Sequence, residues 1–271
     1  MLLARAGVRP KKRFGQNFLV DESAARSIAR LAVSAAPPDG LCMEIGAGTG
    51  ALTLALLEEG ARVTALEIDS ALVALLRGRR ELSAAEIVCA DALTFDYAQW
   101  AGGRRWFVAG NLPYNIATPL MLRLIEMLDG PQSLTVMVQK DVAERLTAVP
   151  GTAAYGSLSV AVQFAMCAEL ALTLAPGSFF PPPKVHSSVV RLVRRAEPAV
   201  STRDEPLFWK VVRAAFAYRR KTLVNSLALA LGFDRARIAR ALAACNISAE
   251  LRGERLDLGD FAKLADALAE G

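Results

Sequence analysis

The sequence predicts an α/β protein with a mostly parallel sheet, followed by a small helical domain. Short apolar runs alternate with helical periodicity over roughly residues 18–166, which is the pattern of βαβ units. A glycine-rich turn follows the first clear strand, and helical periodicity alone remains from about 205 to 269. We therefore expect a sheet domain with a basic N-terminal arm over 1–196 and a helical domain over 197–271.

The first part of the chain alternates helices and strands. Asp21 is a typical helix N-cap, and Pro-Pro-Asp-Gly at 37–40 ends the helix that it begins. Gly60 closes the next helix, and we interpret Asp69 only as the N-cap of another. The expected helices are 22–36, 51–59 and one from residue 70, and the expected strands are 41–45, 62–67 and 86–89.

The second part continues the pattern and then changes it. Thr118 and Pro119 are typical of the cap and first position of a helix. Two late strands are expected to pair like a hairpin at one sheet edge, and the segment 179–187 between them is too rich in proline for either element. The expected strands are 106–110, 134–138, 170–174 and 188–193, and the expected helices are 118–128, 140–148 and 156–166.

Charge is distributed unevenly along the 271 residues. The net charge is +5 over residues 1–30, −5 over 31–190 and +5 over 191–271. Basic regions on either side of an acidic middle favour a polyanionic partner, most simply a nucleic acid. The alternative is an ordinary solvated surface, because many proteins carry a net charge of this size.

Several classes of protein and site are disfavoured. Runs of about 18 apolar residues without a charge are absent from the sequence, so we expect no membrane span. The four cysteines have no paired spacing and are expected to be reduced thiols in the core. The single histidine, His186, cannot form a metal site alone, and we expect neither a metal nor a role for this side chain.

The glycine-rich turn predicts a nucleotide cofactor. Gly46, Gly48 and Ala51 fit the pattern G-x-G-x-x-[GA] between a strand and a helix. Glu67 ends the second strand, where an acid binds a ribose diol. These residues fit both NAD and S-adenosylmethionine. Asp91 follows the third strand, where a carboxylate can accept a hydrogen bond from an adenine amino group. An aspartate there also suits a helix cap or a loop.

The turn Asn111-Leu112-Pro113-Tyr114 follows a buried strand and suits a flat base that bears an amine. The Asn111 side-chain oxygen and the Leu112 carbonyl can each accept an amine hydrogen, and Tyr114 can stack on the ring. Taken alone, the four residues are equally consistent with a plain strand-to-helix turn. A hydride-transfer enzyme does not need this turn. Its presence therefore favours S-adenosylmethionine over NAD as the cofactor.

The chain resembles the ribosomal RNA adenine N6,N6-dimethyltransferases, the family of the KsgA enzymes and the erythromycin-resistance methylases. The resemblance covers nearly the whole length, with small residues at Ala47-Gly-Thr49 where relatives often carry Pro-Gly-Leu. The matching segments, in family order, are Lys12-Arg-Phe-Gly-Gln-Asn-Phe-Leu19, Glu44-Ile-Gly-Ala-Gly48, Asn111-Leu-Pro-Tyr-Asn-Ile-Ala-Thr-Pro119, Gln139-Lys140, Ala154-Tyr-Gly156, Phe179-x-Pro-Pro-Pro-Lys-Val-x-Ser187 and Phe216-x-x-Arg-Arg-Lys-Thr-Leu223.

The resemblance implies a class I S-adenosylmethionine-dependent methyltransferase with a Rossmann-like sheet, an antiparallel edge strand and a C-terminal helical domain. The implied cofactor contacts are Asn17, Leu19, Gly46, Glu67, Asp91 and Asn111, with the N-terminal arm folded over the cofactor. The implied reaction is dimethylation of two adjacent adenosines near the 3′ end of 16S rRNA in immature small subunits. We expect a cytoplasmic monomer.

Two further sets of residues are candidates for contacts with RNA. Tyr114 and Phe179 can clamp a base between them, although Phe179 equally suits a hydrophobic plug under the proline-rich loop. Two basic clusters can bind phosphates, although both also suit solvated surfaces. These clusters are Lys11-Lys12-Arg13 on the arm and Arg219-Arg220-Lys221 at a helix start.

Two rival functions remain open at this stage. A resistance methylase that acts on a single large-subunit adenine shares most of the motifs, but the full 216–223 motif and the arm sequence favour the small-subunit enzymes. The second alternative is that the protein serves mainly as an assembly factor, with methylation as the step that releases it from the particle.

Overall fold

The computed structural model describes residues 10–11 and 14–270, and these form two compact units. The sheet unit contains the chain up to Ala143 together with Cys167–Arg194. The helical unit contains Glu144–Met166 and Arg195–Gly271. Compactness thus assigns residues 144–166 to the helical unit, whereas the sequence pattern placed them in the domain 1–196.

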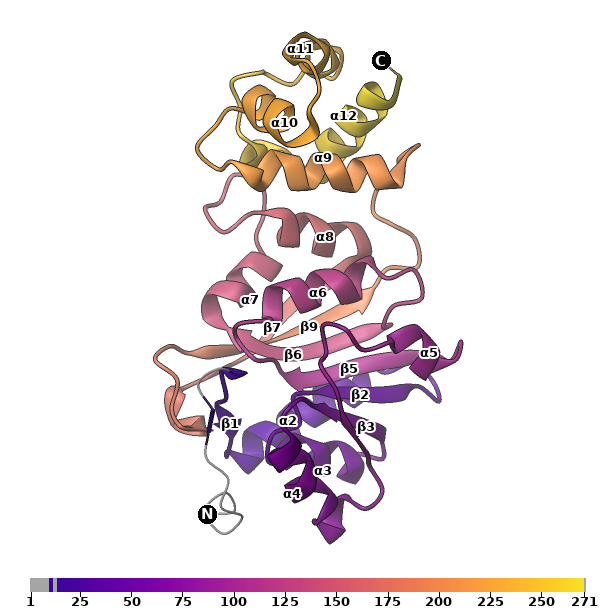
Figure 1. Ribbon diagram of the computed structural model, residues 1–271, viewed down its shortest axis with the longest axis vertical. Helices are drawn as coiled ribbons and strands as arrows, with labels where there is room; N and C mark the ends of the chain where they lie inside the picture. The colour runs from indigo at the N-terminus through magenta and orange to yellow at the C-terminus, as the bar shows by residue number, and fades with distance from the viewer. Residues whose placement is uncertain (1–9, 12–13, 271) are drawn as a thin grey trace. The chain divides into compact units, whose positions relative to one another are not determined.

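A seven-stranded sheet forms the centre of the sheet unit (Figure 1). Five neighbouring strands are parallel, and β9 runs antiparallel to β6, with Val190 opposite Val136. The predicted strands are confirmed, and so is the pairing of the last two at one edge. The order is β4 (Glu86–Cys89), β3 (Arg62–Glu67), β2 (Leu41–Ile45), β5 (Trp106–Asn111), β6 (Ser133–Gln139), β9 (Ser187–Arg194) and β7 (Met166–Leu174).

The strand order reverses between β2 and β5. Both strands are almost wholly buried, as expected for central parallel strands covered by helices on both faces. Because these strands are parallel, their carboxyl ends lie at the same edge of the sheet. In open α/β sheets ligands bind at such a switch point, so the glycine-rich turn after β2 and the turn after β5 lie where a ligand is expected.

The helices of the sheet unit follow the predicted order. Asp21 caps the first, accepting a 3.0 Å hydrogen bond from the Ala24 amide, and Asp69 caps α4. α2 packs against α3 and against β5, β6 and β9 (Figure 1). The elements are α2 (Glu22–Ser34), α3 (Ala51–Glu58), α4 (Ser70–Arg77), η2 (Arg80–Leu82), α5 (Tyr97–Ala101), α6 (Ala117–Glu126), α7 (Lys140–Leu146, which crosses into the helical unit) and η3 (Pro176–Ser178).

The predicted start of α6 is wrong. The helix begins at Ala117 with Ile116 as its N-cap, and Thr118 and Pro119 lie inside its first turn. A tight turn precedes it, because the Ile116 amide donates to the Pro113 carbonyl at 3.1 Å. Pro119 is tolerated there because the first amides of a helix have no partner within the helix.

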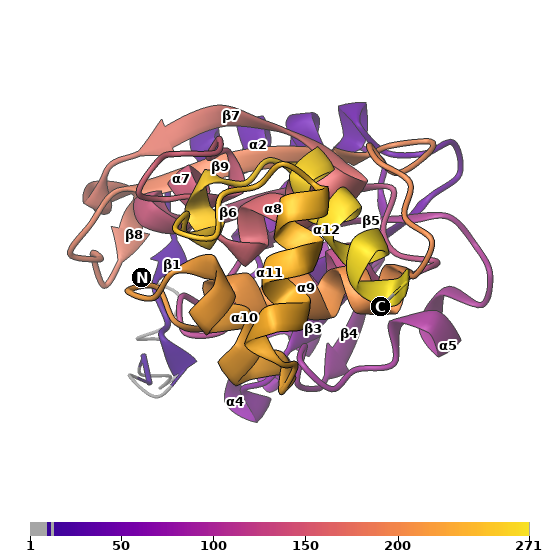
Figure 2. The same ribbon diagram turned by 90° about the horizontal axis from the view of Figure 1, so that it is seen from above.

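The N-terminal arm forms a small sheet that the sequence pattern did not predict. β1 (Phe18–Leu19) pairs antiparallel with β8 (Phe179–Phe180), and the two lie side by side in Figure 2. The Val20 amide also donates to the Ser178 carbonyl at 2.9 Å. The arm is therefore held to the proline-rich segment by backbone hydrogen bonds.

The helical unit has its own aromatic core. Phe164, Phe208 and Trp209 contact one another with ring centroids 4.9–5.1 Å apart. Phe216 contacts both Tyr155 and Phe261. The elements of this unit are α8 (Ser157–Ala165), α9 (Glu205–Ala217), α10 (Leu223–Leu231), α11 (Arg235–Ala244), η4 (Gly253–Arg255) and α12 (Leu258–Glu270).

The cysteines are only partly as expected. All four are free thiols, but only Cys42, on the central strand β2, is buried. Cys89 and Cys167 are exposed because they lie on the two edge strands, β4 and β7. Among the described residues, none of the helices is both long enough and apolar enough to cross a membrane.

Candidate active site

A pocket opens at the carboxyl edge of β2, β3 and β5, within the sheet unit. It encloses about 630 Å³, part of which is open to solvent. Four segments line it: residues 14–19 of the arm, 46–49 after β2, 67–68 at the end of β3 and 111–114 after β5. Eight of the predicted cofactor and catalytic residues line this one pocket, namely Asn17, Leu19, Gly46, Glu67, Asn111, Leu112, Pro113 and Tyr114.

The glycine-rich turn passes close to its neighbours. Gly46 and Gly48 have φ angles of +77° and +57°, which favour glycine. A Cβ on Gly46 would lie 3.1 Å from the Asn111 carbonyl oxygen, and one on Gly48 would lie 3.0 Å from the Phe18 ring. Side chains at these positions would therefore fill the space between the glycine-rich turn, the arm and the end of β5.

Glu67 lies at the end of β3 with its carboxylate fixed by backbone amides. The Gly48 amide donates to Oε2 and the Asp69 amide to Oε1, both at 2.9 Å. Burial raises the pKa of Glu67, and the hydrogen bonds from Asp69 and Gly48 partly offset that rise. Each carboxylate oxygen can accept a second hydrogen bond, so Glu67 can still bind a diol.

Asn111 joins the turn 111–114, which follows β5, to the arm. Its Nδ2 donates a 2.7 Å hydrogen bond to the Asn17 carbonyl oxygen. Since a carbonyl can only accept, this contact directs the other amide atom, Oδ1, elsewhere. The Leu112 amide donates to the Met137 carbonyl of β6 at 3.0 Å, which fixes the next peptide of the turn.

Tyr114 is held through its hydroxyl. That oxygen lies 2.8 Å from Oγ of Ser187, and either hydroxyl can donate in the hydrogen bond that they share. Burial raises the pKa of Tyr114, an effect that the Ser187 contact reduces. Ser187 is part of the proline-rich motif but was not assigned a role from sequence.

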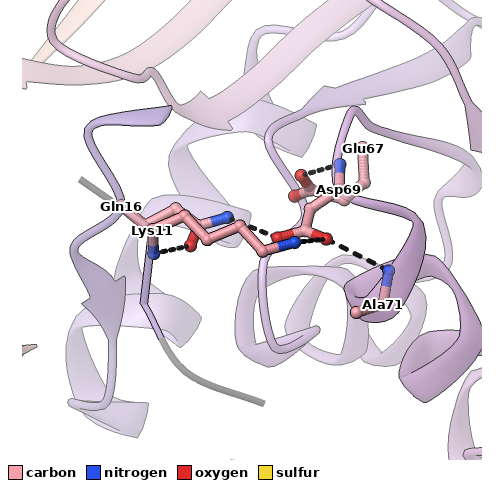
Figure 3. A network of polar contacts seen from close by, with 5 residues as sticks. All are labelled: Lys11, Gln16, Glu67, Asp69 and Ala71. Atoms are coloured by element: carbon pink, nitrogen blue, oxygen red, sulfur yellow. Dashed lines mark hydrogen bonds and ion pairs between the residues drawn. The ribbon is translucent and has the colours of Figure 1, made fainter. Parts of the chain in front are cut away.

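The arm is also held through Asp69 (Figure 3). Lys11 Nζ lies 2.7 Å from Oδ1 of Asp69, and Gln16 Nε2 donates to Oδ2 at 3.2 Å. Burial alone would raise the pKa of Asp69, but hydrogen bonds from Lys11 and Gln16 outweigh it and lower that pKa. The interpretation of Asp69 as an N-cap only is therefore wrong: it caps α4 through the Ala71 amide and holds the arm as well.

Glu44 is a further lining residue without a role assigned from sequence. Its side chain is buried at the base of the pocket, and Oε2 has no hydrogen-bond partner among the described residues. Burial raises the pKa of this carboxyl to about 7, with a smaller contribution from the charge of Glu67 and with Thr53 opposing the rise. Its place in the Glu-Ile-Gly-Ala-Gly motif was the available signal.

Two predicted residues do not line the pocket. Asp91 is half-buried, and its Oδ1 accepts a 2.8 Å hydrogen bond from the Leu93 amide, as in the loop interpretation. Phe179 is only 3% exposed and packs in the core cluster with Leu19, which matches the alternative of a hydrophobic plug. The roles of both residues in binding remain predictions.

The predicted RNA contacts have different environments. Lys11 is engaged with Asp69, whereas Lys12 and Arg13 lie outside the described residues. Arg219 donates to the Ala153 carbonyl at 3.0 Å within the helical unit. Arg220 and Lys221 are exposed in the turn between α9 and α10, not at the helix start itself. Their role in RNA binding remains a prediction.

The charge of the pocket lining distinguishes between the two cofactors considered. Among the described residues that line it, Glu44 and Glu67 are acidic and none is Lys or Arg. With no basic side chain among these described residues to pair with the two phosphates of NAD, the lining is better suited to the cationic sulfonium of S-adenosylmethionine. The glycines of the turn let a ligand approach the backbone closely. The residues present therefore fit S-adenosylmethionine.

Comparisons with known proteins agree with this geometry. The family model for ribosomal RNA adenine dimethylase matches residues 7–269. Proteins named ribosomal RNA small subunit methyltransferase A are similar along almost their whole length. The one from Pseudomonas aeruginosa is 44% identical over 97% of this chain and 96% of its own, and the one from Streptococcus gordonii is 42% identical over 98% and 94%.

Solved structures give the same fold. A dimethyladenosine transferase from Plasmodium falciparum has a TM-score of 0.68 at 25% identity, over 88% of this chain and 94% of its own. The 23S rRNA methyltransferase ErmE has a TM-score of 0.66 at 27% identity, over 93% and 100%. The pocket, the motifs and these matches agree: the chain belongs to the ribosomal RNA adenine dimethylase family.

Proposed function

We propose that this protein uses S-adenosylmethionine to dimethylate the 6-amino groups of two adjacent adenosines near the 3′ end of 16S rRNA. One observation carries the proposal: Asn111, of the Asn-Leu-Pro-Tyr turn, lines the same pocket as the glycine-rich turn and Glu67. That arrangement puts groups suited to an adenine amine beside groups suited to an adenosine cofactor. The family and the names of its near full-length relatives support it.

When bound, S-adenosylmethionine supplies an activated methyl group on a sulfonium. Glu67 would hold the ribose diol, and the backbone at Gly46 would approach the cofactor closely. Asn17 and Leu19 would cover the cofactor from the arm. Asp91 would accept a hydrogen bond from the adenine amino group of the cofactor.

The catalytic turn would act on the target amine by accepting its hydrogens. The lone pair of an adenine amine is delocalised into the ring, so it is a weak nucleophile. Hydrogen bonds to Asn111 Oδ1 and to the Leu112 carbonyl would favour a pyramidal nitrogen and free the lone pair. A strong base is not needed, because the nitrogen becomes acidic once it is cationic. Alignment of the reacting groups supplies most of the rate, up to roughly 7–11 kcal/mol.

The target base must leave its stack to reach this turn. Tyr114 lines the pocket and would cover one face of the base. Phe179 is our proposal for the other face, and it requires the buried ring to become accessible when RNA binds. Arg220 and Lys221, with Arg219 and the basic arm, would bind phosphates and position the RNA without reading its sequence.

The substrate proposed is the immature small subunit, bound by a cytoplasmic monomer that needs no metal. The similarity to ErmE keeps large-subunit RNA as a second candidate. The near full-length relatives at 42–44% identity are small-subunit enzymes by name, which favours the first. We also propose a role in subunit assembly, in which methylation releases the protein from the particle.

Methylation of purified particles tests the substrate. The protein should methylate immature small subunits that lack the modification and should leave large-subunit RNA unmodified. Preference for large-subunit RNA would instead support the resistance-methylase function. The assembly role is tested with Asn111→Ala, which should still bind particles while failing to methylate them; loss of particle binding as well would reject a separate binding role.

A further inference from the structure

The contact between Tyr114 and Ser187 joins the catalytic turn to a rigid part of the sheet. Ser187 is the first residue of β9, pairs with Gln139 at the end of β6, and is fully buried. Its Oγ lies 2.8 Å from the Tyr114 hydroxyl, although the two residues are 73 positions apart in the chain. The turn after β5 is thereby fixed to a strand two positions further along the sheet.

This hydrogen bond restricts the Tyr114 ring. The hydroxyl is the only polar atom of that side chain, and it lies at the far end of the ring from the backbone. A ring held at both ends cannot tilt or swing. The hydroxyl is protonated at neutral pH, because a tyrosine ordinarily titrates at about pH 10 and burial raises the pKa of Tyr114 further. The hydrogen bond therefore persists at neutral pH, and the plane of the ring stays constant.

We propose that Ser187 is a positioning residue that fixes the stacking plane of Tyr114, and that the second methyl transfer to each adenine depends on it more than the first. The inference rests on the proposed function. It extends that function by assigning a determinant of product specificity to a buried serine outside the catalytic turn.

The two transfers place different demands on the site. In each, a bond forms between the adenine nitrogen and the methyl carbon while the carbon–sulfur bond breaks. The electron pair stays on sulfur, and the nitrogen then loses a proton to water. Before the first transfer the amine offers two hydrogens, to Asn111 and Leu112. Before the second it offers one, so stacking on Tyr114 supplies a larger share of the alignment.

Three variants and one matched control isolate the hydrogen bond. Ser187→Ala and Tyr114→Phe each remove one hydroxyl of the pair and keep the ring, and the double variant removes both. Ser188→Ala is the control: Ser188 is the next residue of β9, is also buried, and pairs with Val138. The control loses a buried serine hydroxyl from the same strand but leaves the Tyr114 contact intact.

The readout is the ratio of monomethyladenosine to dimethyladenosine in digested rRNA over a time course. Loss of one neutral hydrogen bond typically changes an equilibrium constant or a rate constant roughly two- to tenfold. We expect Ser187→Ala and Tyr114→Phe each to raise the ratio roughly three- to tenfold, with kcat lowered for the second transfer and cofactor affinity by calorimetry unchanged. The double variant should match the single variants, since both act through one contact. Ser187→Thr, which keeps a hydroxyl, should restore part of the dimethyl product.

Several results would overturn the inference. A wild-type ratio in both single variants would do so, as would additive effects in the double variant or an equal effect of Ser188→Ala. If Ser187→Ala fails to fold, Tyr114→Phe carries the test, because it leaves the strand intact. Absence of any dimethyladenosine with the wild-type protein would instead reject the proposed function itself, so the two failures are distinguishable.

Discussion

The side chain of Asn111 donates a hydrogen bond of 2.7 Å to the backbone carbonyl of Asn17. Asn111, in the turn that follows β5, thus both lines the pocket and holds the arm, whose residues 14–19 line the pocket as well. The acceptor is a backbone atom, so the contact does not depend on the side chain at position 17. The hydrogen bond also assigns the Asn111 amide, because only Nδ2 can donate to a carbonyl.

Replacing Asn111 should affect both catalysis and arm closure. We expect Asn111→Ala to reduce methyl transfer by roughly two orders of magnitude or more, because one acceptor for the target amine is lost. It should also weaken cofactor binding measured by calorimetry, because the arm loses an anchor. Asn17→Ala is the comparison variant: it keeps the carbonyl acceptor and loses only the side chain proposed to contact the cofactor, so it should weaken cofactor binding but lower methyl transfer at saturating cofactor far less. Equal loss of methyl transfer in both variants would contradict the role given to Asn111.

The ion pair between Lys11 and Asp69 should contribute to cofactor binding. Lys11→Ala removes one partner, and Asp69→Asn removes the charge while an asparagine can still cap α4. The Lys11 side chain is 39% exposed, so the effect should be modest. We expect cofactor affinity to fall roughly two- to fivefold and to become less sensitive to salt. Lys210→Ala, on the exposed surface of α9, is the control for charge. A loss of affinity as large as that of Lys11→Ala would argue against a specific role of the Lys11–Asp69 ion pair in cofactor binding.

Most of the fold follows from local patterns in the sequence. The strands 41–45, 62–67 and 86–89 have the predicted bounds, because each is a short apolar run between turn signals. The start of α6 was misplaced because Thr118 and Pro119 satisfy the sequence rules for a cap and a first helical position, whereas the observed N-cap, Ile116, lies two residues before Thr118. The preceding turn, closed by the Pro113 carbonyl, decides where the helix starts.

The arm and its contacts are harder to predict from sequence. β1 and β8 pair across about 160 residues, and two-residue strands have no periodicity to detect. The roles of Asp69 and Ser187 depend on side chains that approach from distant segments. Phe179 shows the same limit. The sequence is consistent both with a ring that stacks on a base and with a ring buried under the proline-rich loop, and only the observed packing distinguishes the two.

The buried carboxyl of Glu44 should make stability depend on pH. Its pKa is raised to about 7 in the folded protein, so the folded state binds a proton that the unfolded state releases near pH 4.5. Stability should therefore fall as pH rises from about 4.5 to 7, by an amount on the order of 3 kcal/mol. Glu44→Gln removes this dependence, and its free energy of unfolding should rise relative to wild type over that range.

Urea unfolding at several pH values checks the Glu44 prediction. Glu58→Gln, on the exposed side of α3, removes the same charge without burial and should show a nearly constant difference from wild type. A constant difference for Glu44→Gln as well would mean that Glu44 titrates in the folded protein as it does in the unfolded chain.

Arg220 should bind a phosphate of the RNA. It is exposed, whereas its neighbour Arg219 donates to a carbonyl of its own unit, so Arg220 is the cleaner test. We expect Arg220→Ala to weaken RNA binding and to lower the slope of log K against log salt by about one. Arg240→Ala, which removes an exposed charge from α11, should change the slope less. An unchanged slope for Arg220→Ala would exclude this contact.

The most direct test of the central claim is transfer of tritiated methyl groups from S-adenosylmethionine to immature small subunits that lack the modification, followed by nucleoside analysis. The account predicts dimethyladenosine at two adjacent adenines with the wild-type protein and almost none with Asn111→Ala. Incorporation without dimethyladenosine, full activity of Asn111→Ala, or no incorporation despite particle binding would contradict it.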